Sequence, residues 1–173
     1  MDLKEAIALI ENDFLLTQDR PSVWADFGCG SGLFTRALCH YLHSGSRIYA
    51  VDKNNYLERN SIENKIEIIP IAADFERDVL PVNKLEGILM ANSLHYVKDK
   101  YSFLFRCRQA FMNETFLIVE YDTDTPVRRW VPYPVSFTSL AQLFRSLGFN
   151  NITRLGERPS SYGRSPMYAA LIR

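Results

Sequence analysis

The stretch "VWADFGCGSGLFTRAL", residues 23–38, constrains the fold of this chain more than any other feature of its sequence. An apolar run typical of a buried strand ends in Asp26, glycines follow at positions 28, 30 and 32, and apolar residues then recur with helical spacing. Glycines between a strand and a helix allow a tight turn and a close approach of a ligand to the backbone. The stretch therefore predicts a strand–turn–helix unit of an α/β fold, with a ligand held at the turn.

Strand-like and helix-like segments alternate along the rest of the chain. Helical spacing predicts one N-terminal helix within residues 1–20 and further helices at 33–42, 101–111 and 138–149. Compact apolar runs predict strands at 23–28, 47–52, 65–74, 85–93, 115–122, 151–157 and 167–173. Thr138 is the expected cap of the last helix and Gly148 its expected end. Pro70 predicts an edge or irregular position for the strand of 65–74.

This alternation predicts a parallel sheet with helices on both faces. Only nine residues, "RPSSYGRSP", separate the last two strands, too few for a crossover helix, so these strands should pair antiparallel. We expect a doubly wound, Rossmann-like α/β sheet of about seven strands, mostly parallel with an antiparallel C-terminal strand. Because no repeat or linker interrupts residues 1–173, one domain is expected. Ligands of such sheets bind at the carboxyl ends of the strands.

Charge and cysteine usage narrow the class of protein. Residues 1–121 hold 13 Lys and Arg against 17 Asp and Glu, whereas residues 122–173 hold 7 Arg against 3 acids. The neutral total argues against nucleic acid as a partner, and the basic C-terminal third leaves room for an anionic small substrate. Three cysteines without C-x-x-C spacing predict neither a disulfide nor a metal site. With no long apolar run, we expect a cytoplasmic protein without membrane contact; no signal favours a particular oligomeric state.

The charges near the glycine turn discriminate among nucleotide-like ligands. A dinucleotide-binding turn, G-x-G-x-x-G, would place its third glycine where this chain has Leu33. Asp26 beside the turn would repel a pyrophosphate and attract a cation. Asp52 ends the second strand, where an acid can bind both ribose hydroxyls, and Asp74 ends the third. These acids predict a cationic, adenosine-like ligand, and S-adenosylmethionine fits that description.

In these segments the chain resembles the class I S-adenosylmethionine-dependent methyltransferases. "DFGCGSG" is similar to their first motif, "YAVDKN" to their ribose-binding segment, "AADF" to their adenine-side motif, and "LEGILMANSLHYVKD" to the fourth-strand segment of small-molecule members. Glu86 stands where the family usually has Asp. The resemblance implies a cofactor site formed by Asp26, Gly28, Cys29, Gly30, Gly32, Asp52, Lys53, Asp74, Phe75, Asn92 and Ser93. In it, Asp26 and the glycines would meet the amino acid end, Asn92 and Ser93 the methionine portion, Asp52 and Lys53 the ribose, and Asp74 and Phe75 the adenine.

Methyl transfer from a sulfonium is an in-line displacement, in which the enzyme mainly aligns the reacting atoms. His95 follows the fourth strand at the ligand end of the sheet, so it is the candidate base for an acceptor that must lose a proton. The alternative interpretation is a histidine that packs against the cofactor or satisfies a backbone group. His40 and His43 are expected at the surface. Cys29 stands at a helix N-terminus, which would lower the pKa of its thiol, but its place inside the turn argues against a nucleophilic role.

The acceptor is expected beside residues 122–137, a loop just past the fifth strand whose aromatic and basic side chains would wall a pocket and neutralise an anionic group. The candidate substrate-binding residues are Tyr96, Tyr121, Arg128, Arg129, Trp130 and Tyr133. Arg158, Tyr162 and Arg164 form a second basic stretch that would approach from the last hairpin. "ANSLHY" stands where amine-directed methyltransferases carry N-P-P-Y or D-P-P-Y, which disfavours an exocyclic amine as the target.

The sequence thus predicts an S-adenosylmethionine-dependent methyltransferase that acts on a small molecule. RNA methylation is one alternative, and it rests on the basic, aromatic C-terminal third. A catalytically silent cofactor-binding or partner-binding protein is another, because the short chain has no obvious cap over the acceptor site. An NAD-dependent oxidoreductase is disfavoured by Leu33 and Asp26.

Overall fold

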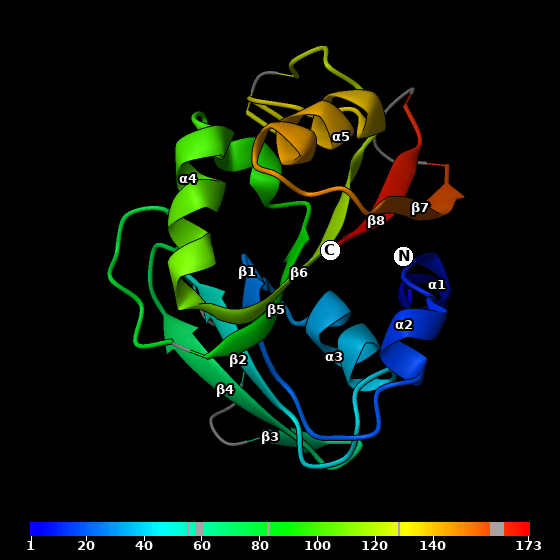
Figure 1. Cartoon of the computed structure of the whole chain (residues 1–173), viewed down its shortest axis with the longest axis vertical. Coiled ribbons are helices and arrows are strands. Elements are labelled where there is room, and N and C mark those ends of the chain that lie inside the picture. Colours follow the sequence, from blue (N-terminus) through cyan, green and yellow to red (C-terminus); the bar gives the residue numbers. More distant parts are fainter. Residues whose placement is uncertain (55, 58–60, 83, 128, 160–164) are drawn as a thin grey trace.

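A computed structural model describes residues 1–173 with the exception of 55, 58–60, 83, 128 and 160–164 (Figure 1). Its helices are α1 (Leu3–Leu9), α2 (Asp13–Leu16), α3 (Leu33–Cys39), α4 (Lys100–Cys107) and α5 (Phe137–Ser146), with short 3₁₀ turns η1 (Leu94–Tyr96) and η2 (Arg108–Ala110). Its strands are β1 (Val23–Phe27), β2 (Arg47–Asp52), β3 (Ser61–Glu63), β4 (Ile66–Ala72), β5 (Leu85–Ala91), β6 (Phe111–Tyr121), β7 (Ile152–Arg158) and β8 (Met167–Ile172).

The strands form one sheet in the order β3-β4-β2-β1-β5-β6-β8-β7. Strands β4, β2, β1, β5 and β6 are parallel, and β8 is antiparallel to both of its neighbours, β6 and β7. The predicted doubly wound sheet with antiparallel C-terminal pairing is therefore confirmed. The sheet has eight strands in the described residues rather than about seven, because the unpredicted strand β3 pairs antiparallel with β4 and forms a hairpin with it.

The unpredicted hairpin turns at Asn64 and Lys65, which both have positive φ, 50° and 63°. This is the backbone geometry of a two-residue turn between twisted strands, but without a glycine it leaves little trace in the sequence. β3 pairs only with residues 66–68 of β4, so Pro70 lies beyond it and pairs with Ala50 of β2 on the other side. Proline has no N–H to donate, and among the described residues β4 has no partner on the β3 side at Pro70, so no hydrogen bond to β3 is lost there.

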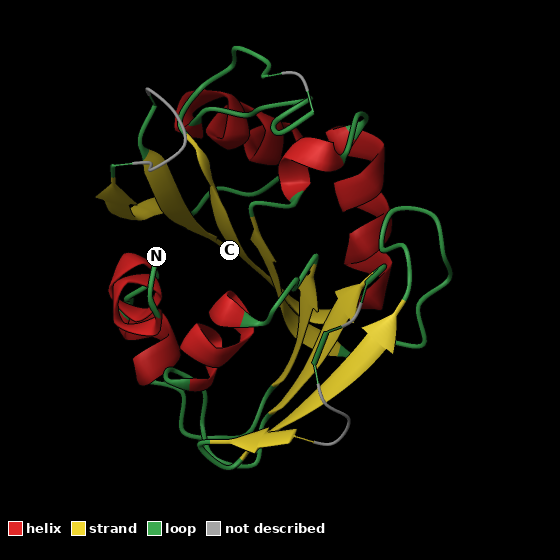
Figure 2. Ribbon diagram, turned by 180° about the vertical axis from the view of Figure 1, so that it is seen from behind, coloured by secondary structure: helices red, strands yellow, loops and turns green. Residues whose placement is uncertain are grey.

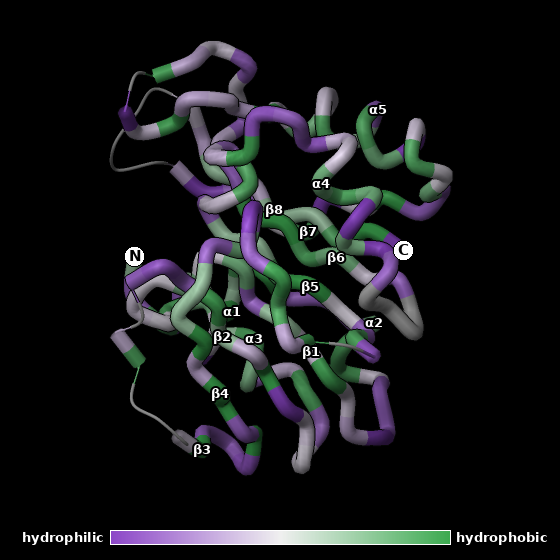
Figure 3. The backbone as a smooth tube through the Cα atoms, turned by 90° about the vertical axis from the view of Figure 1, so that its left-hand side faces the viewer, coloured by the Kyte–Doolittle hydropathy of each residue, from purple (hydrophilic) through white to green (hydrophobic). Residues whose placement is uncertain are grey.

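Helices cover both faces of the sheet (Figures 1 and 2). On one face, α1, α2 and α3 pack on side chains such as Trp24, Leu89 and Leu117. On the other, α4 and α5 pack on a second cluster that includes Phe116 and Ile118. The hydrophobic colouring of the central strands β5, β6 and β8 matches this burial from both sides (Figure 3). No helix in the described part of the chain combines the length and apolar character needed to cross a membrane.

Two helix boundaries differ from the sequence prediction. The N-terminal segment forms two short helices instead of one, because the Asn12 side chain accepts the Leu15 N–H and donates to the Ile10 carbonyl, which caps α2 where α1 has ended. Helix α5 begins two residues earlier than expected: its cap is Ser136, whose Oγ accepts the Ser139 N–H, and Thr138 lies inside the first turn.

The boundary between α4 and β6 also differs. The helix expected over 101–111 ends at Cys107, a 3₁₀ turn follows, and β6 begins at residue 111 rather than 115. The early part of β6 pairs with β5 across a register shift between Leu85 and Gly87. Residues before the apolar run can join a strand through an irregular pairing of this kind. The apolar pattern of "TFLIVEYD" therefore predicted only the regularly paired part of β6.

Candidate active site

The strand–turn–helix unit forms as predicted, with the turn between β1 and α3. Gly28, Gly30 and Gly32 have φ values of 81°, 52° and 80°, in the left-handed region that favours glycine. A Cβ built on Gly28 would lie 2.5 Å from the Ser93 Cβ, so this glycine is also required by close packing. A Cβ on Gly30 would meet no atom within 4 Å. The turn therefore packs on the segment after β5 at its first glycine and is open at its second.

Asp26 lies at the end of β1 and is almost completely buried. The Thr35 hydroxyl of α3 donates to its Oδ2 at 2.6 Å, while its Oδ1 is buried without a hydrogen-bond partner. Burial, together with the nearby charge of Asp52 and against the hydrogen bond from Thr35, raises the pKa of the Asp26 carboxyl to about 7. A carboxylate with one unpaired buried oxygen is suited to receive a cation.

A cavity of about 340 Å³, here called the turn cavity, lies beside this carboxylate. Its lining residues are Met1, Asp26, Gly28, Cys29, Gly30, Ser31, Leu33, Phe34, Ala91, Asn92, Tyr121, Arg158, Pro159 and Met167. Arg158, at the end of β7, donates from Nη2 to Glu5 Oε1 at 3.0 Å, and its Nη1 is buried without a partner. The turn cavity thus carries an unpaired acid oxygen and an unpaired guanidinium nitrogen.

Asp52 is the last residue of β2 and bonds to the turn, and Asp74 follows β4. Asp52 accepts the Gly30 N–H on Oδ2 at 2.9 Å and the Asn54 N–H on Oδ1 at 3.0 Å. Asp74 is paired with Lys53, whose Nζ lies 3.0 Å from Asp74 Oδ2. Burial alone would raise the pKa of Asp74, but Lys53, the Glu76 N–H and Arg77 outweigh it and hold this pKa below its ordinary value.

Phe75 follows Asp74 and stacks on Phe27, with ring centroids 5.9 Å apart. Neither Asp74 nor Phe75 is among the described residues that line the turn cavity.

A second cavity of about 950 Å³, here called the loop cavity, lies under the segment that follows β6. Its lining residues are Asn92, His95, Tyr96, Tyr121, Thr123, Thr125, Val127, Trp130, Val131 and Ser165. Asn92 and Tyr121 also line the turn cavity, so the two cavities meet at these side chains. Asn92 has a φ of 55°, and its Oδ1 is buried without a hydrogen-bond partner.

His95 is buried in η1 and is held by Glu120 of β6. Glu120 accepts the His95 backbone N–H on Oε1 at 3.0 Å, and its Oε2 lies 2.7 Å from the ring Nδ1. The other ring nitrogen, Nε2, is buried without a partner. Sequence reasoning missed Glu120, although an acid inside the apolar run "FLIVEYD" was a usable signal, since a buried acid in a strand needs a partner.

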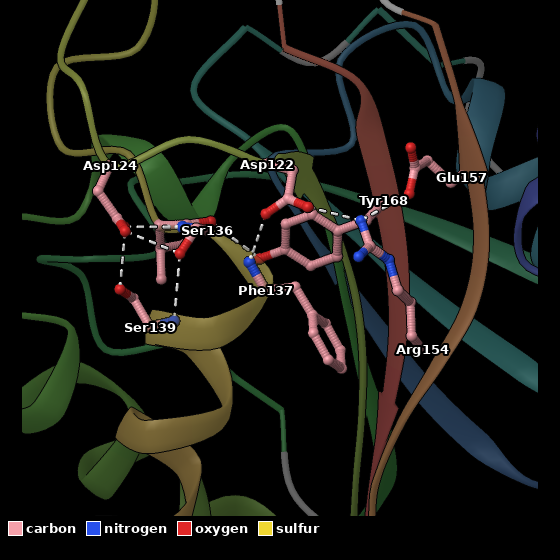
Figure 4. Close-up of polar contacts among 9 residues, drawn as sticks. Asp122, Asp124, Ser136, Phe137, Ser139, Arg154, Glu157 and Tyr168 are labelled. Atoms are coloured by element: carbon pink, nitrogen blue, oxygen red, sulfur yellow. Dashed lines mark hydrogen bonds and ion pairs between the residues drawn. The ribbon is translucent and has the colours of Figure 1, made fainter.

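The loop after β6 is anchored at both of its ends (Figure 4). Asp122 accepts the Phe137 N–H and pairs with Arg154 of β7 at 2.6 Å. Asp124 accepts the N–H and the hydroxyl of Ser136 and the hydroxyl of Ser139, at the start of α5. These contacts hold the segment 122–137, which was expected on the acceptor side, over the loop cavity.

The remaining predicted acceptor residues fall into four groups. Tyr96 and Trp130 line the loop cavity, and half or more of each side chain is exposed. Tyr133 contacts His95 through its backbone, since its N–H donates to the His95 carbonyl. Arg129 is exposed and is not among the lining residues. Arg128, Tyr162 and Arg164 lie outside the described residues.

Two predicted cofactor residues at the turn, Ser93 and Cys29, are buried. The Ser93 hydroxyl donates to the Phe27 carbonyl at 2.6 Å and so connects the segment after β5 to the start of the turn. Burial raises the pKa of the Cys29 thiol, and the charges of Asp26 and Asp52 raise it further. The expectation that a helix N-terminus would lower this pKa is therefore wrong, because desolvation of the thiolate outweighs the helix dipole. His40 and His43 are exposed, as predicted.

Unpaired polar atoms concentrate at the two cavities. Among the described residues, four buried side-chain atoms have no hydrogen-bond partner: Asp26 Oδ1, Asn92 Oδ1, His95 Nε2 and Arg158 Nη1. Each belongs to a residue that lines the turn cavity, the loop cavity or both. Because buried polar groups are normally paired, this grouping indicates a binding site.

Comparison with known proteins identifies the family. A family model described as a methyltransferase domain matches residues 25–119, more than half of the chain. The chain belongs to this methyltransferase family. It is a class I, S-adenosylmethionine-dependent methyltransferase, as its sequence motifs implied. No curated protein matches the sequence significantly.

Solved structures show the same fold as this methyltransferase. The 1,6-didemethyltoxoflavin-N1-methyltransferase of Burkholderia thailandensis is 20% identical with a TM-score of 0.67, over 99% of this chain and 77% of that one. A SAM-dependent methyltransferase of Leishmania major is 17% identical with a TM-score of 0.71, over 99% and 73%. The magnesium protoporphyrin IX methyltransferase of Synechocystis is 14% identical with a TM-score of 0.63, over 99% and 77%.

Proposed function

We propose that this methyltransferase holds the amino acid end of S-adenosylmethionine in the turn cavity and transfers the methyl group in line to a small molecule in the loop cavity. The observation that carries this proposal is the meeting of the two cavities at Asn92 and Tyr121, with the unpaired buried polar atoms grouped on their walls. A methyl group bound at that junction would face an acceptor in the loop cavity. The acceptor atom, the methyl carbon and the sulfur could then lie in line, as the displacement requires.

The charges of the turn cavity match those of an amino acid zwitterion. Asp26 Oδ1 would receive the α-ammonium group of the cofactor, and Arg158 Nη1 would receive its α-carboxylate. Glu5 keeps the guanidinium in place through its ion pair with Nη2. We therefore assign Arg158 to the cofactor, although its sequence context suggested the acceptor.

The rim of the turn suits the nucleoside part. Asp52 would bind the ribose hydroxyls, since its bonds to the Gly30 and Asn54 amides fix the carboxylate there. Asp74 would accept from the adenine amino group, with Lys53 holding it and Phe75 flanking the ring. Gly28, Cys29, Gly30 and Gly32 would shape the turn around the cofactor.

Two solved proteins of this fold support a small acceptor. The Burkholderia thailandensis enzyme was crystallised with 1,6-didemethyltoxoflavin and S-adenosylhomocysteine, and the Synechocystis enzyme is named for magnesium protoporphyrin IX. Both are small molecules with rings.

Cofactor binding is tested by thermal shift with S-adenosylhomocysteine and with NAD. At about 100 times its Kd, the first should stabilise the protein by about 2.7 kcal/mol, and NAD should have no effect. Asp52→Asn keeps an oxygen for the Gly30 amide but removes the charge, so its affinity should fall by about 10- to 150-fold. Glu86→Gln, at the Arg20 ion pair, is the matched control. An unchanged response of Asp52→Asn contradicts the proposed ribose site.

The role of Arg158 is tested with two ligands. Arg158→Gln should weaken binding of S-adenosylhomocysteine by about 10-fold or more and leave 5′-methylthioadenosine, which lacks the amino acid end, unaffected. Isothermal titration measures both affinities. Equal losses for the two ligands would show that Arg158 supports the fold instead of the carboxylate.

The acceptor class is tested by incubating the protein with methyl-labelled S-adenosylmethionine and a cell extract that contains both metabolites and RNA. Label should appear in a small-molecule product. Label only in RNA would overturn the proposed acceptor class, and no labelled product at all would favour a silent binding protein.

A further inference from the structure

The Glu120 carboxylate fixes both the orientation and the proton of the His95 ring. One carboxylate oxygen accepts the backbone N–H of His95 and the other lies 2.7 Å from its Nδ1. Because a carboxylate only accepts hydrogen bonds, a neutral His95 ring paired with it carries its proton on Nδ1. Nε2 is then left with a free lone pair.

This lone pair is available at the loop cavity. Nε2 is buried without a partner, and His95 lines the loop cavity next to Asn92, where that cavity meets the turn cavity. The rings of Tyr96 and Tyr121, which also line this cavity, lie with their centroids 4.4 Å and 6.2 Å from the His95 ring. A buried polar atom without a protein partner, on a residue that lines a cavity, is suited to pair with a ligand there.

The walls of the loop cavity indicate what kind of ligand this is. Aromatic and aliphatic side chains from η1, the end of β6 and the following loop line it, among them Tyr96, Trp130, Val127 and Val131. Besides His95, the described lining residues include no Lys, Arg, Asp or Glu. Flat aromatic walls favour ring stacking, and a cavity of about 950 Å³ is large enough for a molecule of more than one ring.

We propose that His95 is the general base for an uncharged, planar ring compound that is methylated on an O–H or ring N–H group, and that Glu120 is its positioning residue. This inference rests on the proposed function. It differs from the sequence-based expectation of an anionic acceptor. Of the arginines behind that expectation, Arg158 lines the turn cavity, Arg129 lines neither cavity, and Arg128 and Arg164 lie outside the described residues.

The proton and electron balance of the step is complete without another reactant. The acceptor proton passes to the His95 Nε2 lone pair as the acceptor heteroatom forms its bond to the methyl carbon. The methyl–sulfur bonding pair remains on sulfur, so the cofactor leaves as the neutral thioether S-adenosylhomocysteine. The positive charge that was on the sulfonium is now on the imidazolium, where the Glu120 carboxylate stabilises it until the proton is released to solvent.

Glu120→Gln and His95→Asn test the two roles. A glutamine at position 120 can still accept the His95 backbone N–H, but its amide donates to Nδ1 and shifts the ring proton to Nε2, which removes the base. With an acceptor that must lose a proton, both variants should lower kcat by about 10²- to 10⁴-fold while affinity for S-adenosylhomocysteine stays unchanged. The double variant should be no slower than His95→Asn alone, because both changes remove the same function.

A chemical rescue separates a base from a merely structural pair. Nitrophenols that are already ionised at the assay pH need no base, so the two variants should methylate them at a rate close to the wild-type rate. Equal loss with ionised and neutral acceptors, or additive losses in the double variant, would overturn the assignment. Glu86→Gln, an acid-to-amide change at the start of β5, is the matched control for each measurement.

The acceptor class is tested with a panel of phenols, hydroxyquinolines and hydroxypteridines, together with their O-methylated and carboxylated analogues. Methylation of uncharged members with a free O–H or N–H, and not of their O-methylated analogues, is expected. Methylation confined to carboxylated compounds, or a panel without products when the extract assay gives a labelled small molecule, would overturn this inference and leave the proposed function standing. Failure of S-adenosylhomocysteine to bind would instead contradict the proposed function.

Discussion

At Asp26, burial and the neighbouring Asp52 charge raise the pKa of the carboxyl to about 7, well above the ordinary value for an aspartate. In the folded free protein, ionisation of this carboxyl is therefore less favourable than in water, and one of its oxygens is unpaired. A bound α-ammonium group would supply both the missing partner and the opposite charge. Asp26 thus lowers the stability of the free protein, and we expect the same residue to raise the affinity for the cofactor.

Asp26→Asn should change the pH dependence of stability. Because the folded pKa is raised, wild-type Asp26 reduces stability progressively as pH rises from about 4 to about 7, and the reduction is then constant. The variant lacks this titration, so the difference in Tm, variant minus wild type, should grow over that range and level off above it. Thermal unfolding without ligand between about pH 4.5 and pH 8 measures the difference. A difference that does not vary with pH would contradict the raised pKa.

The same variant should lose the pH dependence of cofactor binding. Below pH 7 the wild-type carboxyl is protonated in the free protein, so affinity for S-adenosylhomocysteine should fall by up to about tenfold per pH unit. Asp26→Asn should bind about 10- to 150-fold more weakly at pH 7.5, with a flat profile below it. Asp52→Asn is the control: it should weaken binding and keep the slope, but displace it to lower pH, because the Asp52 charge contributes to the raised pKa of Asp26. Parallel slopes for wild type and Asp26→Asn would show that another group titrates.

The turn and the loop after β6 are the two elements that shape the site. The turn combines three left-handed glycines with contact against Ser93 of the segment after β5. The loop is held by Asp122 and Asp124, which connect it to α5 and β7 (Figure 4). The turn is held by close packing at Gly28, and the loop is held by side chains at its two ends.

Gly28→Ala and Gly30→Ala separate strain from crowding in the turn. Both place alanine in a left-handed conformation, which costs about 1–2 kcal/mol. Only Gly28→Ala also drives a Cβ to within 2.5 Å of the Ser93 Cβ. We expect Gly28→Ala to destabilise the protein by at least about 1 kcal/mol more than Gly30→Ala, as measured by urea unfolding. Equal destabilisation would contradict the close packing of the turn on Ser93.

Asp124→Ala should loosen the acceptor loop without affecting the turn. It removes three hydrogen bonds to Ser136 and Ser139. We expect a higher KM for the acceptor, an unchanged affinity for S-adenosylhomocysteine, and a loss of stability of about 1 kcal/mol at neutral pH. Steady-state kinetics and isothermal titration measure the first two. A change in cofactor affinity would show that the loop and the turn are coupled.

The stability effect of Asp124→Ala has its own pH test. Burial favours a raised pKa, but the hydrogen bonds from Ser136 and Ser139 prevail and keep the pKa of Asp124 below its ordinary value. The stabilisation is therefore present above the unfolded pKa and is lost as pH falls through the folded one. Wild type and variant should converge in stability in acid, whereas a gap that persists there would contradict these contacts.

Across the whole molecule, contacts join segments that are far apart in the sequence. Arg158 at the end of β7 pairs with Glu5 of α1, and Arg20 pairs with Glu86 at the start of β5. α1 packs against both α3 and β7, so the N-terminal segment bridges the two halves of the sheet. We propose on these grounds that residues 1–173 fold as one domain.

Hydrogen exchange should resolve this domain into a stable centre and weaker edges. Amides of β1, β5 and the half of β6 between β5 and β8 are bonded on both sides and should exchange only with global unfolding. Amides of β3 and β7 at the two sheet edges should exchange first, in a protein with a single thermal transition. Two resolved transitions, or central strands that exchange as fast as the edges, would contradict a single domain.

Much of the fold and part of the site could be predicted from the sequence because they depend on local pattern. The period of apolar residues determined the order of strands and helices, and the glycines marked the turn. Parallel strands end on one side of a sheet, so Asp26 and Asp52 could be placed near the turn without coordinates. The hairpin at β3 was missed because its turn residues, Asn64 and Lys65, do not carry the usual signal.

Only the tertiary structure decided which polar atoms are paired and which remain free. Thr35 occupies one oxygen of Asp26 and leaves the other unpaired, Glu120 binds one nitrogen of His95 and leaves the other unpaired, and Glu5 does the same for Arg158. Each pairing depends on burial and on a partner that the fold brings close. Local sequence therefore determined that a methyltransferase turn is present, while long-range packing determined which atoms face its ligands, because hydrogen bonding is satisfied in three dimensions and not along the chain.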